Sequence, residues 1–163
     1  MHSRDLAGSA AQVGALLDSL SSPDDRLWPN ESWPRMRFDR PLGVGAVGGH
    51  GPIRYVVESY EPGLQVRFRF TGPRGFVGTH GLDVEAMHPG RTTLVHSLEM
   101  EARGAARIGW PLLFRPLHDA LVEDALDQAE RSLGLSPHGA VWSRRVRALR
   151  LLMRTAGRAR PKR

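Results

Sequence analysis

The amino-acid sequence predicts an α+β domain in which a curved antiparallel sheet wraps around one long C-terminal helix. Four consecutive segments between residues 53 and 101 alternate apolar and polar side chains, which is the period of strands with one wet face. Short sequences rich in glycine and proline separate these segments, as in an antiparallel meander. Residues 105–134 then return to helical spacing. One long helix is therefore available to cover one concave sheet, and we expect a mostly apolar cavity between them.

The chain before the meander predicts shorter elements. Residues 2–7 are expected to form a first strand, and Ser9 is expected to cap a helix from Ala10 to Leu20. The pairs Trp28-Pro29 and Trp33-Pro34 indicate an ordered, packed connection, because a residue before proline is pushed out of the α region.

A glycine-rich run follows a short predicted strand at Met36–Asp39. Five glycines lie between residues 43 and 51, a density that also occurs in loops that cradle phosphate. This run lacks the Lys-Ser/Thr ending of a P-loop, and a strand rather than a helix comes after it. We therefore interpret the run as a flexible turn or bulge.

The meander places two histidines on faces that are otherwise apolar. The expected strands are Ile53–Tyr60, Leu64–Thr71, Phe76–Met87 and Thr92–Glu101. The apolar faces of the last three carry Val66, Phe68 and Phe70, then His80, Leu82, Val84 and Ala86, and then Leu94, His96, Leu98 and Met100. Since consecutive strands of a meander are neighbours, His80 and His96 are expected to point into one cavity.

The helical segment at 105–134 is expected to cover that cavity. Its apolar side is marked by Trp110, Leu113, Leu117, Leu121 and Leu126. Pro111 and Pro116 should disturb its first turns because proline has no amide donor, and Gly134 should end it.

Bulk composition excludes several classes of protein. A length of 163 residues favours one domain, and the absence of cysteine excludes disulfides, thiol catalysis and thiolate-bound zinc. The first residues lack the apolar core of a secretory signal, and no stretch approaches 18 continuous apolar residues. We expect a cytoplasmic protein.

The positive charge belongs to the end of the chain. Nine of the 23 Lys and Arg residues lie within residues 136–163, a segment without Asp or Glu. The remaining 14 basic residues face 17 acidic residues, so residues 1–135 carry a net charge of −3. We therefore divide the chain into a ligand-binding domain at 1–135 and a basic tail at 136–163, and we do not expect a nucleic-acid-binding core.

The tail predicts a basic amphipathic helix from about Trp142 to Arg154. Its apolar residues at helical spacing are Trp142, Val146, Leu149 and Met153. Such a helix can lie on an anionic membrane surface, bind nucleic acid through phosphates, or dock its apolar stripe on the body or on a second subunit. The acidic body favours docking, and nucleic acid is the least expected partner.

Several short segments resemble one known superfamily. They are Leu27-Trp28-Pro29, residues 48–55, Tyr60-Glu61-Pro62-Gly63, Gly78-Thr79-His80, the strand with His96, and Trp110 through Leu121. Together they resemble the helix-grip superfamily, called SRPBCC or START-like, and within it a bacterial subgroup of the polyketide cyclase/dehydrase-like kind. The resemblance covers about residues 1–135 and implies a ligand cavity between the sheet and the long helix.

The leading hypothesis is a module that binds a small hydrophobic molecule of a lipid-, aromatic- or polyketide-like kind. The expected contacts are Tyr55, Phe68, Phe70, His80, His96, Leu98, Trp110, Phe114, Leu117 and His118. Two alternatives stay open. One is a polyketide cyclase- or dehydratase-like enzyme in which His80, His96 or His118 moves protons, and the other is a protein-interaction module of the co-chaperone type.

The other polar residues are interpreted more plainly. No metal and no cofactor are expected, because positions 80, 96 and 118 contain no local chelating pair. Asp119 and Glu123 share a helix face, and a water-exposed face explains these and the following acids, Asp124 and Asp127, better than paired carboxylates in catalysis do. Arg54, Arg67 and Arg69 are expected to meet cross-strand acids such as Glu58, and His50 is placed either at the cavity mouth or in an exposed loop.

Overall fold

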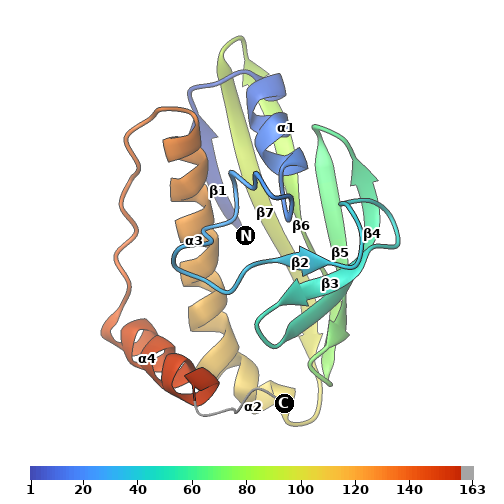
Figure 1. Cartoon of the computed structure of the whole chain (residues 1–163), viewed down its shortest axis with the longest axis vertical. Coiled ribbons are helices and arrows are strands. Elements are labelled where there is room, and N and C mark those ends of the chain that lie inside the picture. Colours follow the sequence, from blue (N-terminus) through green and yellow to red (C-terminus); the bar gives the residue numbers. More distant parts are fainter. Residues whose placement is uncertain (159–163) are drawn as a thin grey trace.

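The computed structural model describes residues 1–158, with side chains as far as Leu152. One seven-stranded antiparallel sheet is accompanied by helices on its concave side and at one end (Figure 1). The elements in chain order are β1 (His2–Leu6), α1 (Ala10–Asp18), β2 (Arg37–Phe38), β3 (Val47–His50), β4 (Ile53–Glu61), β5 (Gln65–Gly72), β6 (Phe76–His88), β7 (Arg91–Ala102), α2 (Ala106–Gly109), a π-helical turn η1 (Trp110–Phe114), α3 (Arg115–Ser132) and α4 (Arg144–Arg158). The predicted α+β class, meander and long helix are confirmed.

The sheet order is β1-β7-β6-β5-β4-β3-β2. The meander from β2 to β7 pairs consecutive strands, while β1 adds to the free edge of β7, with His2 opposite His96. The helix α3 lies across the concave face, and α1 packs beside it against β6 and β7 (Figure 1). The buried core joins these layers through Leu6, Leu17, Phe68, Leu94 and Leu126. None of the helices within residues 1–158 is long and apolar enough to cross a bilayer.

The first helix begins where the sequence indicates. Ser9 accepts a hydrogen bond from the Gln12 amide, and the Gln12 side chain accepts one from the Ser9 amide. This reciprocal capping box satisfies two backbone donors that the first turn of a helix leaves free.

The prolines reshape the start of the long helix as expected. The segment 105–134 is divided into α2, the wider turn η1 with Pro111, and α3 with Pro116 in its first turn. A proline removes an amide donor and pushes against the preceding turn, so the regular hydrogen-bond ladder is interrupted here. The result places Trp110, Leu113 and Phe114 along one wall of the cavity described below.

The glycine-rich run is only partly the flexible turn that its composition indicated. Residues 43–46 form a turn and a short connection, but Val47–His50 are strand β3, which pairs with β2 and β4. A Cβ at Gly48 would collide with the carbonyl oxygen of Arg37, and Gly49 has a φ of 150°. Glycine is therefore needed because two backbones approach closely within a sheet.

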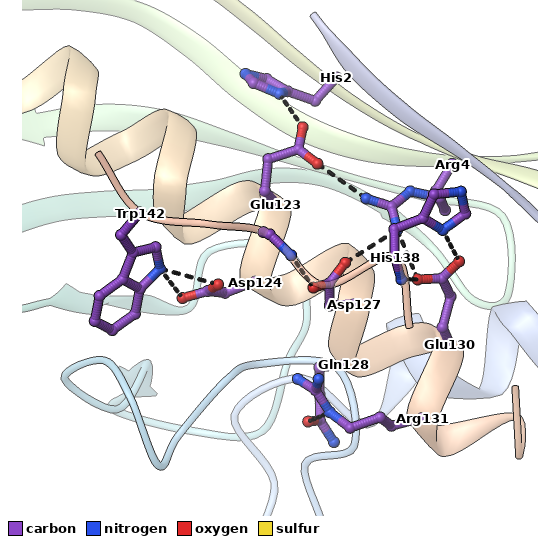
Figure 2. Close-up of polar contacts among 11 residues, drawn as sticks. His2, Arg4, Glu123, Asp124, Asp127, Gln128, Glu130, Arg131, His138 and Trp142 are labelled. Carbon is purple, nitrogen blue, oxygen red and sulfur yellow. Dashed lines mark hydrogen bonds and ion pairs between the residues drawn. The ribbon is translucent and has the colours of Figure 1, made fainter. Parts of the chain in front are cut away.

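A row of acids on α3 holds the connection that leads to α4. Asp124, Asp127 and Glu130 are spaced three residues apart, and we call them the acidic ladder. The connection runs along the outside of α3 (Figure 1), and His138, Ala140 and Trp142 supply its donors at alternate positions. Figure 2 shows the carboxylates facing this segment.

The contacts of the acidic ladder are short. Glu130 accepts from the His138 amide at 3.0 Å and lies 2.6 Å from its Nδ1, and Asp127 accepts from the Ala140 amide at 2.7 Å. The Trp142 indole donates to Asp124 at 2.9 Å. Asp127 is only 4% exposed. The expected water-exposed face is therefore wrong at Asp127, because its carboxylate is occupied by buried donors.

Arg4 ties β1 to the same helix face. Its guanidinium donates to Glu123 at 2.9 Å, to Asp127 at 3.0 Å and to Glu130 at 2.6 Å, as Figure 2 shows. Since its side chain is 10% exposed, this is a largely buried ion-pair network that fastens the edge strand to α3.

The basic tail docks on the body through its apolar stripe. Val146 is 5% exposed, Leu149 packs against the core, and the Arg150 guanidinium lies 4.3 Å from the Trp33 ring and 3.9 Å from the Trp142 ring. The predicted helix is present, although it begins at Arg144. The predicted side chains at Met153 and Arg154 lie outside the described residues.

Candidate functional site

The space between sheet and helix contains two adjacent hollows. An inner compartment of about 50 Å³ lies over β5–β7, and an outer compartment of about 330 Å³ opens beside η1. Both are lined by His50, His80, His118 and Leu121, which form the boundary between them. Of the described residues that line the two hollows, none is charged.

Most of the residues expected at the site lie around these compartments. Phe68, His80, His96 and His118 line the inner one. Phe70, His80, Trp110, Phe114, Leu117 and His118 line the outer one. The strand period and the helix period together are sufficient to predict these positions, because each period fixes which face a side chain occupies.

Two expected lining residues are corrected by the structure. Tyr55 is completely buried behind Phe68 and His80, with ring centroids 4.9 and 5.1 Å away, so it supports the wall without forming its surface. Leu98 pairs with His80 but lies one strand nearer the β1 edge. It therefore faces a third hollow, together with His2 and Trp110.

The three predicted histidines converge. His80 on β6 and His96 on β7 are diagonal neighbours, since Leu82 is the register partner of His96. Their ring centroids are 5.8 Å apart, and the His118 ring approaches from α3 to 5.0 Å from His96.

Burial keeps two of these imidazoles neutral. His80 is 9% exposed and His96 is 6% exposed. Loss of hydration lowers the pKa of each well below its usual range, and the nearby histidines lower both further. At neutral pH each ring therefore offers one donor and one acceptor, and no charge.

One nitrogen on each of the three rings is buried without a hydrogen-bond partner among the described residues. These atoms are His80 Nε2, His96 Nδ1 and His118 Nε2. Native interiors leave few such atoms unpaired, because each costs about 1–3 kcal/mol. The site therefore carries unused hydrogen-bonding capacity inside an apolar wall.

His118 differs from the other two because it has a carboxylate partner. Its Nδ1 lies 3.1 Å from Asp119 Oδ1, while its Nε2 is buried without a partner among the described residues. The hydrogen bond from His118 lowers the pKa of the Asp119 carboxyl, and His2 adds to the effect. A carboxylate that orients an imidazole is the usual arrangement around a general base.

His2 joins this cluster although the sequence interpretation did not select it. Its Nδ1 lies 2.7 Å from Glu123 Oε1, and its Nε2 lies 3.3 Å from Asp119 Oδ1. The signal was the alternation of His2, Arg4 and Leu6 on one face of the first strand, opposite the i, i+4 acids Asp119 and Glu123. That face meets α3 only when β1 pairs with β7.

The remaining predicted polar residues are placed as follows. His50 is partly buried at the compartment boundary, its Nδ1 is 3.2 Å from the Tyr55 hydroxyl, and burial lowers its pKa to about 3. Arg69 pairs with Glu58 at 3.1 Å, as expected, and Arg67 pairs with Asp83 at 2.7 Å. Arg54 instead donates to the carbonyls of Gly51 and Ile53.

Comparisons by sequence find no relative, since no protein-family model and no curated protein matches the chain. Comparisons by structure do. A Thermobifida fusca protein matches with a TM-score of 0.61 at 18% identity, over 85% of this chain and 97% of its own. Norcoclaurine synthase from Thalictrum flavum matches with a TM-score of 0.59 at 16% identity, over 81% and 91%. CalU16 from Micromonospora echinospora matches with a TM-score of 0.55 at 14% identity, over 96% and 84%.

Each of these matches covers at least 81% of this chain. The chain has the helix-grip fold. The resemblance to SRPBCC and START-like proteins is thereby confirmed for the fold, and at such low identity for the fold alone. What this helix-grip chain binds is argued from its own residues.

Proposed function

We propose that this helix-grip protein binds a small, uncharged, mostly apolar molecule that carries a hydroxyl or carbonyl group. This proposal rests on three histidines that line an apolar cavity, each with one buried nitrogen that has no hydrogen-bond partner among the described residues. A ligand group that reaches His80, His96 or His118 can form hydrogen bonds with these nitrogens. The helix-grip neighbours support a ligand-binding role as a class.

The absence of charge on the described walls of the cavity limits which ligands can bind. The described lining residues include no Lys, Arg, Asp or Glu, and the pKa of His80 and of His96 lies well below its usual range, chiefly because of burial. An ionised carboxylate or phosphate would enter this cavity without a counter-charge, which is costly. A neutral aromatic or polyketide-like molecule fits better than a fatty acid.

The volumes of the two compartments limit the size of the ligand. The outer compartment of about 330 Å³ lies at the low end of the range for small-molecule sites, roughly 300–1,000 Å³. The inner compartment of about 50 Å³ accommodates only a small group. A compact ring system in the outer space, with its polar end towards the histidines, matches both.

A tryptophan scan of two adjacent residues tests the location. Leu113 lines the outer compartment, whereas Leu112 is 57% exposed and lies outside it. With 2-naphthol as the fluorescent probe, Leu113→Trp should weaken binding at least tenfold because the indole fills the space, and Leu112→Trp should leave it unchanged. Equal affinities in the two variants would place the ligand elsewhere.

A comparison of two probes tests the polar anchors. Wild type should prefer 2-naphthol over naphthalene by about tenfold, the value of one hydrogen bond of about 1 kcal/mol or slightly more. The double variant His80→Ala, His96→Ala should lose this preference, while the exposed His88→Ala should keep it. A preference that survives the double variant contradicts the anchoring role.

The His118–Asp119 pair favours acid–base catalysis as a second candidate function. Burial lowers the pKa of His80 and of His96, which makes both weak bases. His118 is therefore the remaining candidate for a general base among the three histidines. His118 lines both compartments and its Nε2 is buried without a partner among the described residues, while Asp119 holds the opposite nitrogen at 3.1 Å. Such a pair can remove a proton next to a carbonyl, the first step of a cyclisation or dehydration.

Exchange of α-protons of 2-tetralone in D₂O, followed by NMR, tests this step. Wild type should accelerate the exchange, His118→Gln should abolish the acceleration, and Asp119→Asn should reduce it at least tenfold. His88→Gln is the control. Wild-type rates in Asp119→Asn would leave ligand binding as the function. A shallow space filled by side chains would favour the interaction-module hypothesis, whereas the outer compartment has a volume of about 330 Å³.

A further inference from the structure

A second group of convergent ligand atoms lies where β1 meets α3, and it shares His118 with the two compartments. His2, His118 and Asp119 each offer one ligand atom, and these three atoms lie within 4.8 Å of one another. His2 Nε2 is 3.3 Å and His118 Nδ1 is 3.1 Å from the same oxygen, Asp119 Oδ1. Two imidazole nitrogens and one carboxylate oxygen thus face a common point.

Surrounding residues orient two of the three groups, His2 and Asp119. Glu123 Oε1 accepts from His2 Nδ1 at 2.7 Å, which turns the opposite nitrogen, Nε2, towards the common point. Glu123 is itself held by Arg4 at 2.9 Å through its other oxygen, as Figure 2 shows. A carboxylate behind a ligating histidine is the usual support in metal sites. The second oxygen of Asp119 lies 3.8 Å from Arg115, so Oδ1 is left for the common point.

The cluster also has access to an open space. A third hollow of about 450 Å³ is bordered by His2, His118 and Asp119, together with Leu98, Met100 and Trp110. The three ligand-bearing side chains are neither fully buried nor freely exposed, with His2 at 22%, His118 at 18% and Asp119 at 42%. An ion can reach the cluster from this side, and its outward coordination positions face the hollow.

We propose that His2 Nε2, His118 Nδ1 and Asp119 Oδ1 bind a divalent first-row transition metal such as Zn²⁺. Two neutral imidazoles and a carboxylate suit these ions, whereas Mg²⁺ and Ca²⁺ prefer oxygen ligands throughout. Three protein ligands leave at least one position for water or for an outside ligand, as in zinc sites that are not purely structural. The cost of a metal in this place is low, because the groups already converge.

The proposal goes beyond ligand binding in the compartments and can fail independently of it. His2 lines neither compartment, so its removal leaves the walls of the proposed ligand site intact. The metal also competes directly with the proton that His118 Nδ1 shares with Asp119. If His118 acts as a base, Zn²⁺ should therefore slow the 2-tetralone exchange.

Zinc competition against a chromophoric chelator tests the site in the full chain without a histidine tag. His2→Ala and Asp119→Asn should each weaken Zn²⁺ binding at least 100-fold, and Glu123→Gln should weaken it about tenfold. His88→Ala is the matched control for an exposed histidine and should bind as wild type. Zinc affinity in His2→Ala within twofold of wild type, or an equal loss in His88→Ala, overturns the proposal.

Two further measurements separate loss of metal from loss of fold. Far-ultraviolet circular dichroism should be the same in wild type and in each variant, and Zn²⁺ should raise the Tm of wild type but not of Asp119→Asn. Substitution by Co²⁺ should give visible absorption bands in wild type that disappear in His2→Ala. An identical rise in Tm in all the variants would indicate adventitious surface binding and contradict the assignment.

Discussion

At the scale of the residue, the protein uses histidine as an aromatic core residue. The His80 ring lies 4.8 Å from Phe70 at 22°, 5.1 Å from Phe68 and 5.1 Å from Tyr55. An imidazole in this position packs like a small aromatic ring and keeps one hydrogen-bonding atom available. This environment tolerates the neutral form only.

The first stability prediction follows from that neutrality. The unfolded chain takes up protons below about pH 6.5, whereas burial lowers the pKa of His50 to about 3 and those of His80 and His96 well below the usual range. Because the unfolded state then binds more protons, stability falls as the pH falls below 6.5. Each such histidine should cost about 1 kcal/mol between pH 7 and pH 5.5.

Urea unfolding at pH 7.0 and pH 5.5 measures this loss. His80→Gln should reduce the acid-induced loss by about 1 kcal/mol, because one of the three groups no longer titrates. His88→Gln replaces an exposed histidine and should leave the loss unchanged. The same acid dependence in His80→Gln and wild type would contradict the account.

Single positions also show where the sequence was sufficient. Phe68, His80, His96 and Leu117 line the compartments on the faces that the strand and helix periods indicate, because each period fixes the face that a side chain occupies. Leu98 was placed wrongly, because its distance from the helix depends on where β1 joins the sheet. No local pattern contains that information.

At the scale of the element, the acidic ladder decides how α3, β1 and the tail hold together. The alternate donors at His138, Ala140 and Trp142 meet acids three residues apart on α3. Gly139, at a φ of 76°, lies between the first two contacts and lets the segment bend towards the helix. Arg4 shares two of the same carboxylates, so one helix face binds both a strand and a connection.

Removing the central acid should destabilise both attachments. Asp127→Ala leaves the Ala140 amide without its acceptor and weakens the pairing of Arg4, so it should cost about 3 kcal/mol in urea unfolding. Glu58→Ala removes an exposed ion pair with Arg69 and should cost less than about 1 kcal/mol. Equal costs for the two would show that the ladder is only a surface feature.

The ladder could not be predicted from the sequence. Charged residues on an isolated helix are normally exposed, which is the interpretation that Asp124 and Asp127 received. Their partners lie in the first strand, in the connection that contains Trp33, and in an irregular segment after the helix. The basic amphipathic helix itself was predictable from its spacing, and its docking was favoured by the acidic body.

At the scale of the whole molecule, consecutive pairing explains why the architecture was predictable. Strands β4 to β7 follow one another with short turns, and each pairs with its neighbour in the chain. The curvature, the division of the cavity and the attachment of β1 were not predictable, because they arise from packing between distant segments. The sequence therefore indicated a cavity between sheet and helix with His80, His96 and His118 at its walls. The position of His2 beside Asp119 and Glu123 is visible only in the structure.

The attachment of α3 to β1 affects how fast a bound ligand can leave the cavity. Arg4 on β1 holds the helix against the edge of the sheet, so α3 cannot move away from the sheet without breaking the ion pairs of Arg4 with Glu123, Asp127 and Glu130. The rest of the rim of the outer compartment consists of Trp33-Pro34, residues 51–53, and Trp110, Leu113 and Phe114 of the π-helical turn. The residence time of a bound ligand should therefore be set by small movements of this proline- and glycine-containing rim. The helix α3 should stay in place while the ligand enters and leaves.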